Sequence, residues 1–330
     1  MQPGNINRIL IIRLSSLGDV LLTTPVIRAL KKQFPGAVID FLVKEEYSNA
    51  VKFNPNINVV YALSRSEKIK FLLKILKRNN YNFVVDLQNN IRSRIIAGYL
   101  NIITYSFKKP TWNKYLLVKF KINRYKEIKS ITQMYCESVP GLKLDKLGLE
   151  LYTPQITDSA LLHDKNYIGF CPGSKHFTKR WPAEYFIELG ENLINNGYKL
   201  VLFGGAEDKQ VCDFISCRVK GSINLCSSND IFKTAADIKR CKVVVCNDSG
   251  LMHVAASAGV PVVALFGSSV KEFGFSPYGI PNIILENKSL SCRPCSHIGM
   301  DNCAKKHFKC MKEITPQIVY NNLTQFLSKL

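Results

Sequence analysis

The feature that most constrains the fold is a regular alternation of short apolar runs with stretches of helical periodicity. In the first half we expect strands at 8–13, 37–43, 57–61, 83–86 and 102–105, and helices at 19–34 and 67–78. In the second half we expect strands at 167–171, 199–203, 243–246 and 260–266, and helices after Pro182, at 251–258 and at 316–330. Strands that alternate with helices form parallel sheets covered on both faces. The chain is therefore predicted to be an α/β protein with two doubly wound, Rossmann-like halves.

The length of 330 residues fits two domains. The stretch 151–165 has mixed polarity and contains Pro154, so we place the boundary there. The predicted domains are 1–155 and 156–330, and the second ends in the helix at 316–330. Doubly wound sheets bind ligands beyond the carboxyl ends of their strands. We therefore expect the site in a cleft between the halves, with the turns after the strands supplying the chemistry.

Composition narrows the class of protein further. Hydrophobic residues make up 46% of the chain and charged residues 21%, which is typical of globular proteins and argues against disorder. No apolar run reaches the roughly 18 residues of a membrane span, and the four-residue run between Arg8 and Arg13 is too short for a secretory signal. We expect a cytoplasmic protein.

The net charge of +20 is unevenly distributed along the chain. Residues 1–155 hold 25 basic and 10 acidic side chains, whereas 156–330 hold 20 and 15. A basic half indicates an anionic partner, such as a phosphate-bearing substrate, a membrane surface or a nucleic acid. The alternative is a general Lys-rich composition, which does not account for the asymmetry.

The turn after the first predicted strand is a candidate anion and catalytic site. Gly18 allows a sharp turn, and Ser15, Ser16 and the free N–H groups of the following helix start can bind an anion. Asp19 is the candidate catalytic carboxylate, and the alternative is an ordinary helix N-cap. No Gly-x-Gly-x-x-Gly occurs at this turn, and the chain lacks a P-loop motif.

Two turns of the second half carry candidate donor-binding groups. In the segment 171–182, Ser174, Thr178 and Lys179 place two hydroxyls and an ammonium near a helix start, a combination that suits a diphosphate. The alternative is a solvated basic loop. After the next strand, Glu207 can accept hydrogen bonds from a sugar hydroxyl, or it can be a first-turn acid that complements the helix dipole.

A third turn follows the strand at 243–246. Asp248 can bind sugar hydroxyls, and Ser249 and Gly250 can bind phosphate oxygens at the helix start. His253 lies one turn further along this helix. Its alternative role is that of a buried histidine with satisfied hydrogen bonds.

These segments together resemble the ADP-heptose:lipopolysaccharide heptosyltransferases, glycosyltransferase family nine, and in particular its heptosyltransferase-II-like members. The resemblance rests on the order and spacing of the segments 8–31, 171–182, 203–208 and 247–267. It implies the GT-B fold, with two Rossmann-like domains facing each other across a cleft. It also implies inverting, metal-independent transfer of heptose from ADP-heptose to a lipopolysaccharide inner-core acceptor, with the acceptor on the first domain and the donor on the second.

The resemblance also assigns roles to individual residues. Asp19 matches the family's general base, Lys179 its phosphate-binding lysine and Glu207 its nucleotide-contacting acid. Asp248, Ser249 and Gly250 match its donor-binding turn. No cofactor or divalent metal is expected, and the chain has no Asp-x-Asp element.

Two other functions remain open from the sequence. One is a GT-B transferase or an epimerase that acts on another nucleotide sugar. The other is a basic nucleic-acid-binding protein, although the motifs lie at strand ends rather than on one basic face. Donor base, acceptor hydroxyl and oligomeric state are not determined by the sequence.

Four of the eleven cysteines, Cys292, Cys295, Cys303 and Cys310, cluster near the C-terminus. The Cys-x-x-Cys pair with two later thiols suits tetrahedral zinc, but the spacing is not that of a zinc ribbon. Zinc binding, disulfides and reduced packing thiols all remain open.

Residues 108–129 hold eight basic side chains and one acid, interleaved with aromatic and aliphatic residues. This pattern is typical of a segment at an anionic bilayer surface. We expect it to dock the first domain on the inner face of the cytoplasmic membrane, because the acceptors of the resembling enzymes are lipid-linked. The alternatives are a nucleic-acid contact and a loop folded onto its own domain.

Overall fold

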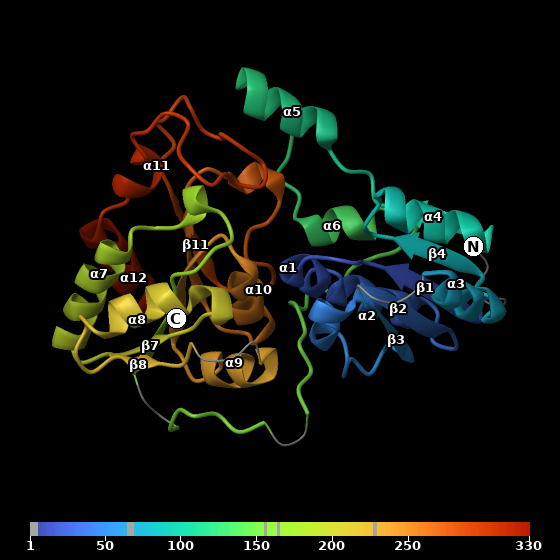
Figure 1. Cartoon of the computed structure of the whole chain (residues 1–330), viewed down its shortest axis with the longest axis horizontal. Coiled ribbons are helices and arrows are strands. Elements are labelled where there is room, and N and C mark those ends of the chain that lie inside the picture. Colours follow the sequence, from blue (N-terminus) through green and yellow to red (C-terminus); the bar gives the residue numbers. More distant parts are fainter. Residues whose placement is uncertain (1–5, 65–68, 155–156, 164–165, 227–229) are drawn as a thin grey trace. The chain divides into compact units, whose positions relative to one another are not determined.

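The computed structural model describes residues 6–330 except 65–68, 155–156, 164–165 and 227–229. The chain forms two compact units (Figure 1). Unit 1 comprises Met1–Lys109 and Lys129–Pro154, and unit 2 comprises Pro110–Ile128 and Gln155–Leu330. The division at 154 lies one residue from the expected boundary, whereas the assignment of 110–128 to unit 2 was not expected.

Unit 1 is built on a five-stranded parallel sheet in the order β3-β2-β1-β4-β5. The strands are β1 (Arg8–Ile12), β2 (Val38–Lys44), β3 (Val59–Leu63), β4 (Phe83–Asp86) and β5 (Ile103–Ser106). Its helices are α1 (Leu17–Leu21), α2 (Thr24–Gln33), the 3-10 helix η2 (Glu45–Ala50), α3 (Ile69–Arg78), α4 (Ile91–Leu100) and α6 (Ile131–Cys136).

Helices α3 and α4 cover one face of this sheet. Leu72, Leu73 and Leu76 of α3 pack in one apolar cluster with Ile96 and Leu100 of α4 and with the side chains of β1, β2 and β4. Strand β1 lies at the centre, and its apolar residues are fully buried. A central strand buried on both faces is a near-continuous apolar run, as the sequence indicated.

Unit 2 is built on a six-stranded parallel sheet in the order β11-β10-β9-β6-β7-β8. The strands are β6 (Tyr167–Cys171), β7 (Lys199–Leu202), β8 (Ile223–Asn224), β9 (Val243–Asn247), β10 (Val262–Phe266) and β11 (Asn282–Glu286). The helices are α5 (Thr111–Phe120), η3 (Phe177–Lys179), α7 (Ala183–Asn195), η4 (Ala206–Asp208), α8 (Lys209–Ser216), α9 (Ile231–Ile238), α10 (Gly250–Ser257), η5 (Lys271–Phe273), α11 (Lys309–Lys312) and α12 (Pro316–Leu327).

The main core of unit 2 is organised around Trp181. Its ring is buried against Tyr185 and Phe186, and its indole N–H donates to the carbonyl of Ile314 at 2.7 Å. Helix α12 packs on α7 and contributes Val319 and Leu323 to the same cluster. The basic loop 171–182 is therefore anchored at its end by a core tryptophan.

The excursion 110–128 packs on unit 2 through one side of α5. Leu117 lies in a small apolar cluster with Val270 and Phe273. The ammonium of Lys114 lies 5.5 Å from the ring centroid of Phe275. The ammonium of Lys121 donates to two carbonyls of the cysteine-rich loop, at 2.7 and 3.1 Å.

Several expected elements differ from the structure. The helix predicted at 19–34 is two helices, because the chain bends at Thr23 and Pro25 occupies the first turn of α2. Helix α4 was not predicted, and neither were the edge strands β8 and β11. Strands β4 and β6 have the predicted bounds. In the described part of the chain, no helix is long and apolar enough to cross a membrane.

Candidate active site

In unit 1, the turn between β1 and α1 holds Asp19 firmly in place. Ser16 is the N-cap of α1, and Asp19 is the third helical residue, so Asp19 itself is not the N-cap. Oδ2 of Asp19 accepts hydrogen bonds from the backbone N–H of Ser16 at 3.1 Å and from its hydroxyl at 2.8 Å. This reciprocal arrangement is a capping box, which fixes the carboxylate at the helix start.

The other carboxylate oxygen of Asp19 faces Arg13. Arg13 Nη2 lies 2.7 Å from Asp19 Oδ1, and both side chains are largely buried, with 8% and 17% of their surface exposed. The same guanidinium donates through Nη1 to the carbonyl of Leu87 at 2.6 Å. The guanidinium of Arg13 thus places a fixed positive charge directly beside the Asp19 carboxylate.

Tyr135, from α6, completes this environment. Its ring is fully buried, and the Arg13 guanidinium lies 5.4 Å from the ring centroid. Burial raises the pKa of Tyr135, and the neighbouring charge of Asp19 and a hydrogen bond to it raise that pKa further. The phenol therefore stays protonated and donates to the carboxylate. Neither Arg13 nor Tyr135 was predicted from the sequence as a site residue.

The end of β4 supports the same turn. Gln88 Oε1 accepts the backbone N–H groups of Leu14 and Ser15 at 2.9 and 3.2 Å. Asp86 is fully buried and accepts from the backbone N–H groups of Gln88 and Asn89 and from the hydroxyl of Ser93. The serine turn is thus fixed by the neighbouring strand as well as by its own helix.

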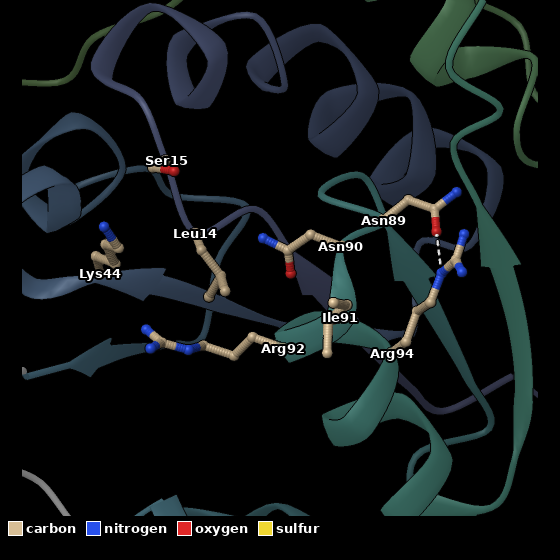
Figure 2. Close-up of a pocket in the computed structure, with 8 residues that line it drawn as sticks. All are labelled: Leu14, Ser15, Lys44, Asn89, Asn90, Ile91, Arg92 and Arg94. Atoms are coloured by element: carbon tan, nitrogen blue, oxygen red, sulfur yellow. Dashed lines mark hydrogen bonds between the residues drawn. The ribbon is translucent and has the colours of Figure 1, made fainter. Parts of the chain in front are cut away.

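A pocket of about 670 Å³ opens beside this turn (Figure 2). Its lining residues are Leu14, Ser15, Lys44, Asn89, Asn90, Ile91, Arg92 and Arg94. Three of them are cations and none is an acid, although the Lys44 ammonium lies 3.3 Å from Glu46. The predicted Ser15 is part of this lining, and the pocket suits an anionic ligand.

In unit 2, two candidate donor-binding residues, Lys179 and Asp248, form an ion pair. Lys179 Nζ lies 2.7 Å from Asp248 Oδ2, and their side chains are 14% and 9% exposed. The hydroxyl of Ser269 donates to the same oxygen at 2.6 Å. The lysine from 171–182 and the aspartate from 247–267 thus lie in direct contact, a pairing that was not predicted from the sequence, and Ser269 was not anticipated either.

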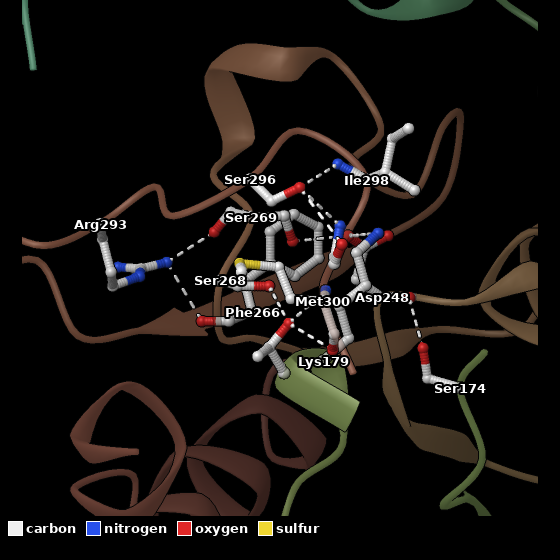
Figure 3. Close-up of polar contacts among 12 residues, drawn as sticks. Ser174, Lys179, Asp248, Phe266, Ser268, Ser269, Arg293, Ser296, Ile298 and Met300 are labelled. Carbon is white, nitrogen blue, oxygen red and sulfur yellow. Dashed lines mark hydrogen bonds and ion pairs between the residues drawn. The ribbon is translucent and has the colours of Figure 1, made fainter. Parts of the chain in front are cut away.

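The loop that bears Ser269 is held by a buried arginine (Figure 3). Arg293 donates to the carbonyls of Gly267, Phe266 and Ser269 and pairs with Glu286 Oε2 at 3.0 Å. A buried guanidinium needs this many acceptors, because an unpaired charge there is costly. Arg293 therefore holds the loop that positions Ser269 against Asp248.

Other predicted residues of the donor turn divide into two groups. Ser174 is buried and donates weakly to the carbonyl of Asp248 at 3.4 Å, so it borders the turn. Ser249 is the N-cap of α10, and in the described residues its buried hydroxyl makes no hydrogen bond. Gly250 is the first residue of α10. A free hydroxyl at a helix start is a site for a phosphate oxygen.

The second group comprises Thr178, His253 and Glu207, which either make structural contacts or lie away from the Lys179–Asp248 pair. The hydroxyl of Thr178 accepts from Met300 N at 2.8 Å and from Ser268 Oγ at 2.9 Å, so it ties two loops together. His253 is buried within α10. Glu207 is exposed in the first turn of η4. The next residue, Asp208, is half-buried and faces Gly173. A Cβ atom added at Gly173 would lie 2.0 Å from Oδ1 of Asp208. Any larger residue at position 173 would therefore have to displace the Asp208 carboxylate.

All eleven cysteines are free thiols. Cys303 and Cys310 pack in or against the core of unit 2, and burial raises the pKa of Cys310 to about 12. Cys292 Sγ lies 3.9 Å from His307 Nε2. Among the described residues, no group of three or more His, Cys, Asp or Glu side chains is arranged to hold a metal ion, so the zinc candidate gains no support.

Two parallel α/β units with polar turns at the carboxyl ends of their strands have the GT-B fold. The profile of glycosyltransferase family 9 (heptosyltransferase) matches residues 69–306. The chain belongs to this family.

Named relatives agree with this assignment. The chain is 28% identical to lipopolysaccharide heptosyltransferase 2 of Salmonella typhimurium, over 98% of this chain and 99% of the relative. It is 26% identical to the Escherichia coli K12 protein of the same name, over 97% and 98%.

Solved structures share the fold. A family 9 glycosyltransferase from Veillonella parvula matches with a TM-score of 0.79 and 25% identity, over 98% of both chains. The Escherichia coli ADP-heptose lps heptosyltransferase II matches with a TM-score of 0.73 and 23% identity, over 98% and 99%.

Proposed function

We propose that this glycosyltransferase transfers heptose from ADP-heptose to a lipopolysaccharide inner-core acceptor, with inversion at the anomeric carbon. The observation that carries the proposal is the contact of Lys179 with Asp248 at the start of α10, in a chain of the heptosyltransferase family. The names of the relatives, lipopolysaccharide heptosyltransferase 2, support this donor and acceptor.

Unit 2 supplies the donor chemistry. As the glycosidic bond to the diphosphate breaks, negative charge grows on the leaving phosphate oxygen. The ammonium of Lys179, the free Ser249 hydroxyl and the N–H groups of α10 stabilise that charge. Because a fixed protein cation does this work, we expect the reaction to proceed without a divalent metal.

Asp19 acts as the general base in this proposal. The acceptor hydroxyl gives its proton to the carboxylate while its oxygen attacks the anomeric carbon and the nucleoside diphosphate leaves. A carboxylate has about four lone-pair positions, and the contacts from Arg13, Ser16 and Tyr135 occupy them, so the acceptor hydroxyl would take the place of one of these donors. Asp19→Asn should bind donor normally and lose about 10²–10⁴-fold in turnover.

The pocket of Figure 2 is the acceptor candidate in unit 1. Its cations suit the carboxylate or phosphate groups of an acidic core saccharide, and Ser15 places the pocket in the same turn as Asp19. Arg92→Gln should raise the KM for acceptor and leave the affinity for ADP unchanged. A raised donor KM with an unchanged acceptor KM would remove the pocket from the proposal.

We also assign the segment 108–129 to an anionic membrane surface, on the cytoplasmic side where a lipid-linked acceptor would be met. Trp112, Tyr115 and Phe120 are 65%, 47% and 55% exposed, and their rings contact one another. The segment packs with unit 2, so such a contact would anchor the donor unit rather than the first domain. The cations Lys114 and Lys121 already have partners within unit 2, as described above.

Vesicle binding tests this segment. Replacing Trp112 and Phe120 together by Ser should weaken co-sedimentation with phosphatidylglycerol vesicles about tenfold or more, because two large apolar side chains are lost. Phe214→Ser on α8 is the matched control, since Phe214 is also exposed in unit 2. Equal losses in the two proteins would refute the assignment.

The function itself is tested by ligand-induced stabilisation and by product analysis. ADP and ADP-heptose should raise the free energy of unfolding by about 2.7 kcal/mol at about 100 times their Kd, whereas UDP and GDP should give smaller shifts. Heptose transfer to a heptose-deficient core acceptor should then be seen by mass spectrometry. A donor altered in the absence of acceptor would indicate an epimerase instead.

A further inference from the structure

Helix α4 is apolar on the face that points away from its own unit. Ile96, Ala97 and Leu100 face the core cluster of unit 1. Ile91, Ile95 and Tyr99 are spaced four residues apart on the opposite side, and they are 80%, 57% and 42% exposed. A surface helix normally carries polar residues there. The outward stripe therefore calls for an apolar contact from outside the unit.

Helix α3 extends this apolar stripe into one surface. Phe71 is 63% exposed, while its neighbours Leu72 and Leu73 are buried. The ammonium of Lys77 on α3 lies 5.2 Å from the ring centroid of Tyr99 on α4, so the outer sides of the two helices are in contact. Figure 1 shows the two helices next to each other on unit 1. We call the outer faces of α3 and α4 the α3–α4 surface.

The charge of this surface has one sign. Lys70, Lys74, Lys77, Arg78, Arg92 and Arg94 are all exposed on the two helices. Over residues 69–109 the sequence contains a single acid, Asp86, and its side chain is fully buried in a hydrogen-bond network. Among the described residues no carboxylate forms an ion pair with any of the six cations. The surface thus presents cations around apolar side chains.

We propose that the α3–α4 surface docks on an anionic lipid bilayer. Exposed apolar residues surrounded by cations match the two components of such a surface, its acyl boundary and its anionic headgroups. An acidic soluble protein would match the cations but not the three aliphatic and aromatic side chains of α4. Each cation that reaches the headgroups raises binding about fivefold, so six give strong complementarity even if only half make contact.

The position of the α3–α4 surface links membrane docking to the candidate acceptor pocket. Ile91, Arg92 and Arg94 belong to α4 and also line the pocket beside Ser15. A bilayer held against α4 brings the headgroup of a membrane lipid to the mouth of that pocket. This link rests on the proposed lipid-linked acceptor, but the docking itself is measured without acceptor or donor.

Ile95→Glu tests the apolar stripe. Ile95 is exposed and does not line the pocket, so the variant should fold and should keep its stabilisation by ADP. Co-sedimentation with vesicles of phosphatidylcholine and phosphatidylglycerol should weaken about tenfold or more, in low and in high salt. The matched control is Ile318→Glu on α12 of unit 2, where the isoleucine is 42% exposed. This control should bind vesicles as wild type does.

Lys74→Gln combined with Arg78→Gln tests the charge. These two changes should weaken binding by about twentyfold in low salt and have little effect in high salt, where surface charges are screened. Neither residue lines the pocket, so turnover on a detergent-solubilised acceptor should be unchanged.

Three results would overturn the proposal. They are equal vesicle binding by Ile95→Glu and Ile318→Glu, equal binding of wild type to neutral and anionic vesicles, and conversion of a dimer to a monomer by Ile95→Glu without loss of vesicle binding. The last result would assign the surface to a second copy of the chain. Vesicle binding without ADP-induced stabilisation would instead refute the proposed function and leave the docking intact.

Discussion

Replacing Arg13 by Gln offers a direct measure of how Asp19 works. The guanidinium contacts Asp19 at 2.7 Å, and both side chains are largely buried. An opposite charge at this distance favours the ionised form of a carboxylate. A hydrogen bond to a charged group contributes about 1.5–3 kcal/mol, so this pair is a substantial part of what holds the turn.

The expected result is a shift in the pH profile of kcat/KM. A general base works only when it is deprotonated, so activity falls as the pH drops through the titration of that group. Without Arg13 the ionised carboxylate loses its cationic partner, so the acid limb should move to higher pH. The plateau at higher pH should be largely retained. Asp86, Lys109 and Tyr135 also face Arg13 or Asp19, and their charges are unchanged in the variant.

The matched control is Arg28→Gln in the same unit. Arg28 forms a comparable ion pair with Asp145, at 2.5 and 2.6 Å, and also contacts Glu150. Losing that pair should lower stability without moving the acid limb. The reasoning is refuted if both variants leave the limb where it is in wild type, or if Asp19→Asn retains near-normal turnover.

Three further outcomes are expected. Lys179→Ala should weaken ADP binding, measured by calorimetry, about 10- to 100-fold, because the diphosphate loses a charged hydrogen-bond partner. If the variant bound ADP with wild-type affinity, Lys179 would lie outside the donor site. Turnover should be unaffected by EDTA, whereas a loss restored by magnesium or manganese would contradict the role given to that lysine. The hydrogen bond from Arg28 lowers the pKa of Asp145, so this pair stabilises unit 1 above about pH 4 and loses its contribution as pH falls through the lowered pKa. Urea denaturation of wild type and Asp145→Asn should therefore differ at neutral pH and converge in acid, and a constant difference would refute the linkage.

The strands of both sheets, except the edge strands β8 and β11, could be predicted from the sequence, because a strand buried on both faces is a continuous apolar run. Strands β4 and β6 consist of apolar runs bounded by polar turns, and the sequence gives their limits. Helix α4 left no such signature, because Ile91, Ile95 and Tyr99 place apolar residues on its outer side as well. The helical period of alternating apolar and polar residues is then absent. The exposed apolar residues that obscure the helical period are the same residues that indicate a partner for the outer face of α4.

The candidate site was predictable where its residues lie in one turn. Asp19, Lys179 and Asp248 follow strands, and the fold brings such residues to the carboxyl ends of the sheets. Tyr135 is more than a hundred residues from Asp19 in sequence, and only the packing of α6 against unit 1 brings it near. Ser269 follows the end of β10, so the same rule could have identified it, but it was not predicted. Its partner Arg293 is in a loop of irregular structure that no periodicity identifies.

The positions of the charged residues distinguish two explanations of the excess positive charge: a general bias in composition and a surface that binds a partner. A bias alone would place lysines and arginines wherever the surface is free, and carboxylates of the same unit would pair with many of them. Arg28 and Arg13 do have such carboxylate partners, and Lys121 is used in contacts within unit 2. On α3 and α4, by contrast, cations gather around exposed apolar residues in a stretch whose single acid is buried. Mutual repulsion among these cations costs stability in isolation. Repelling cations and exposed isoleucines are both unfavourable in water, and both become favourable against an anionic lipid surface. The position of these cations on the α3–α4 surface therefore explains the excess positive charge of the first half.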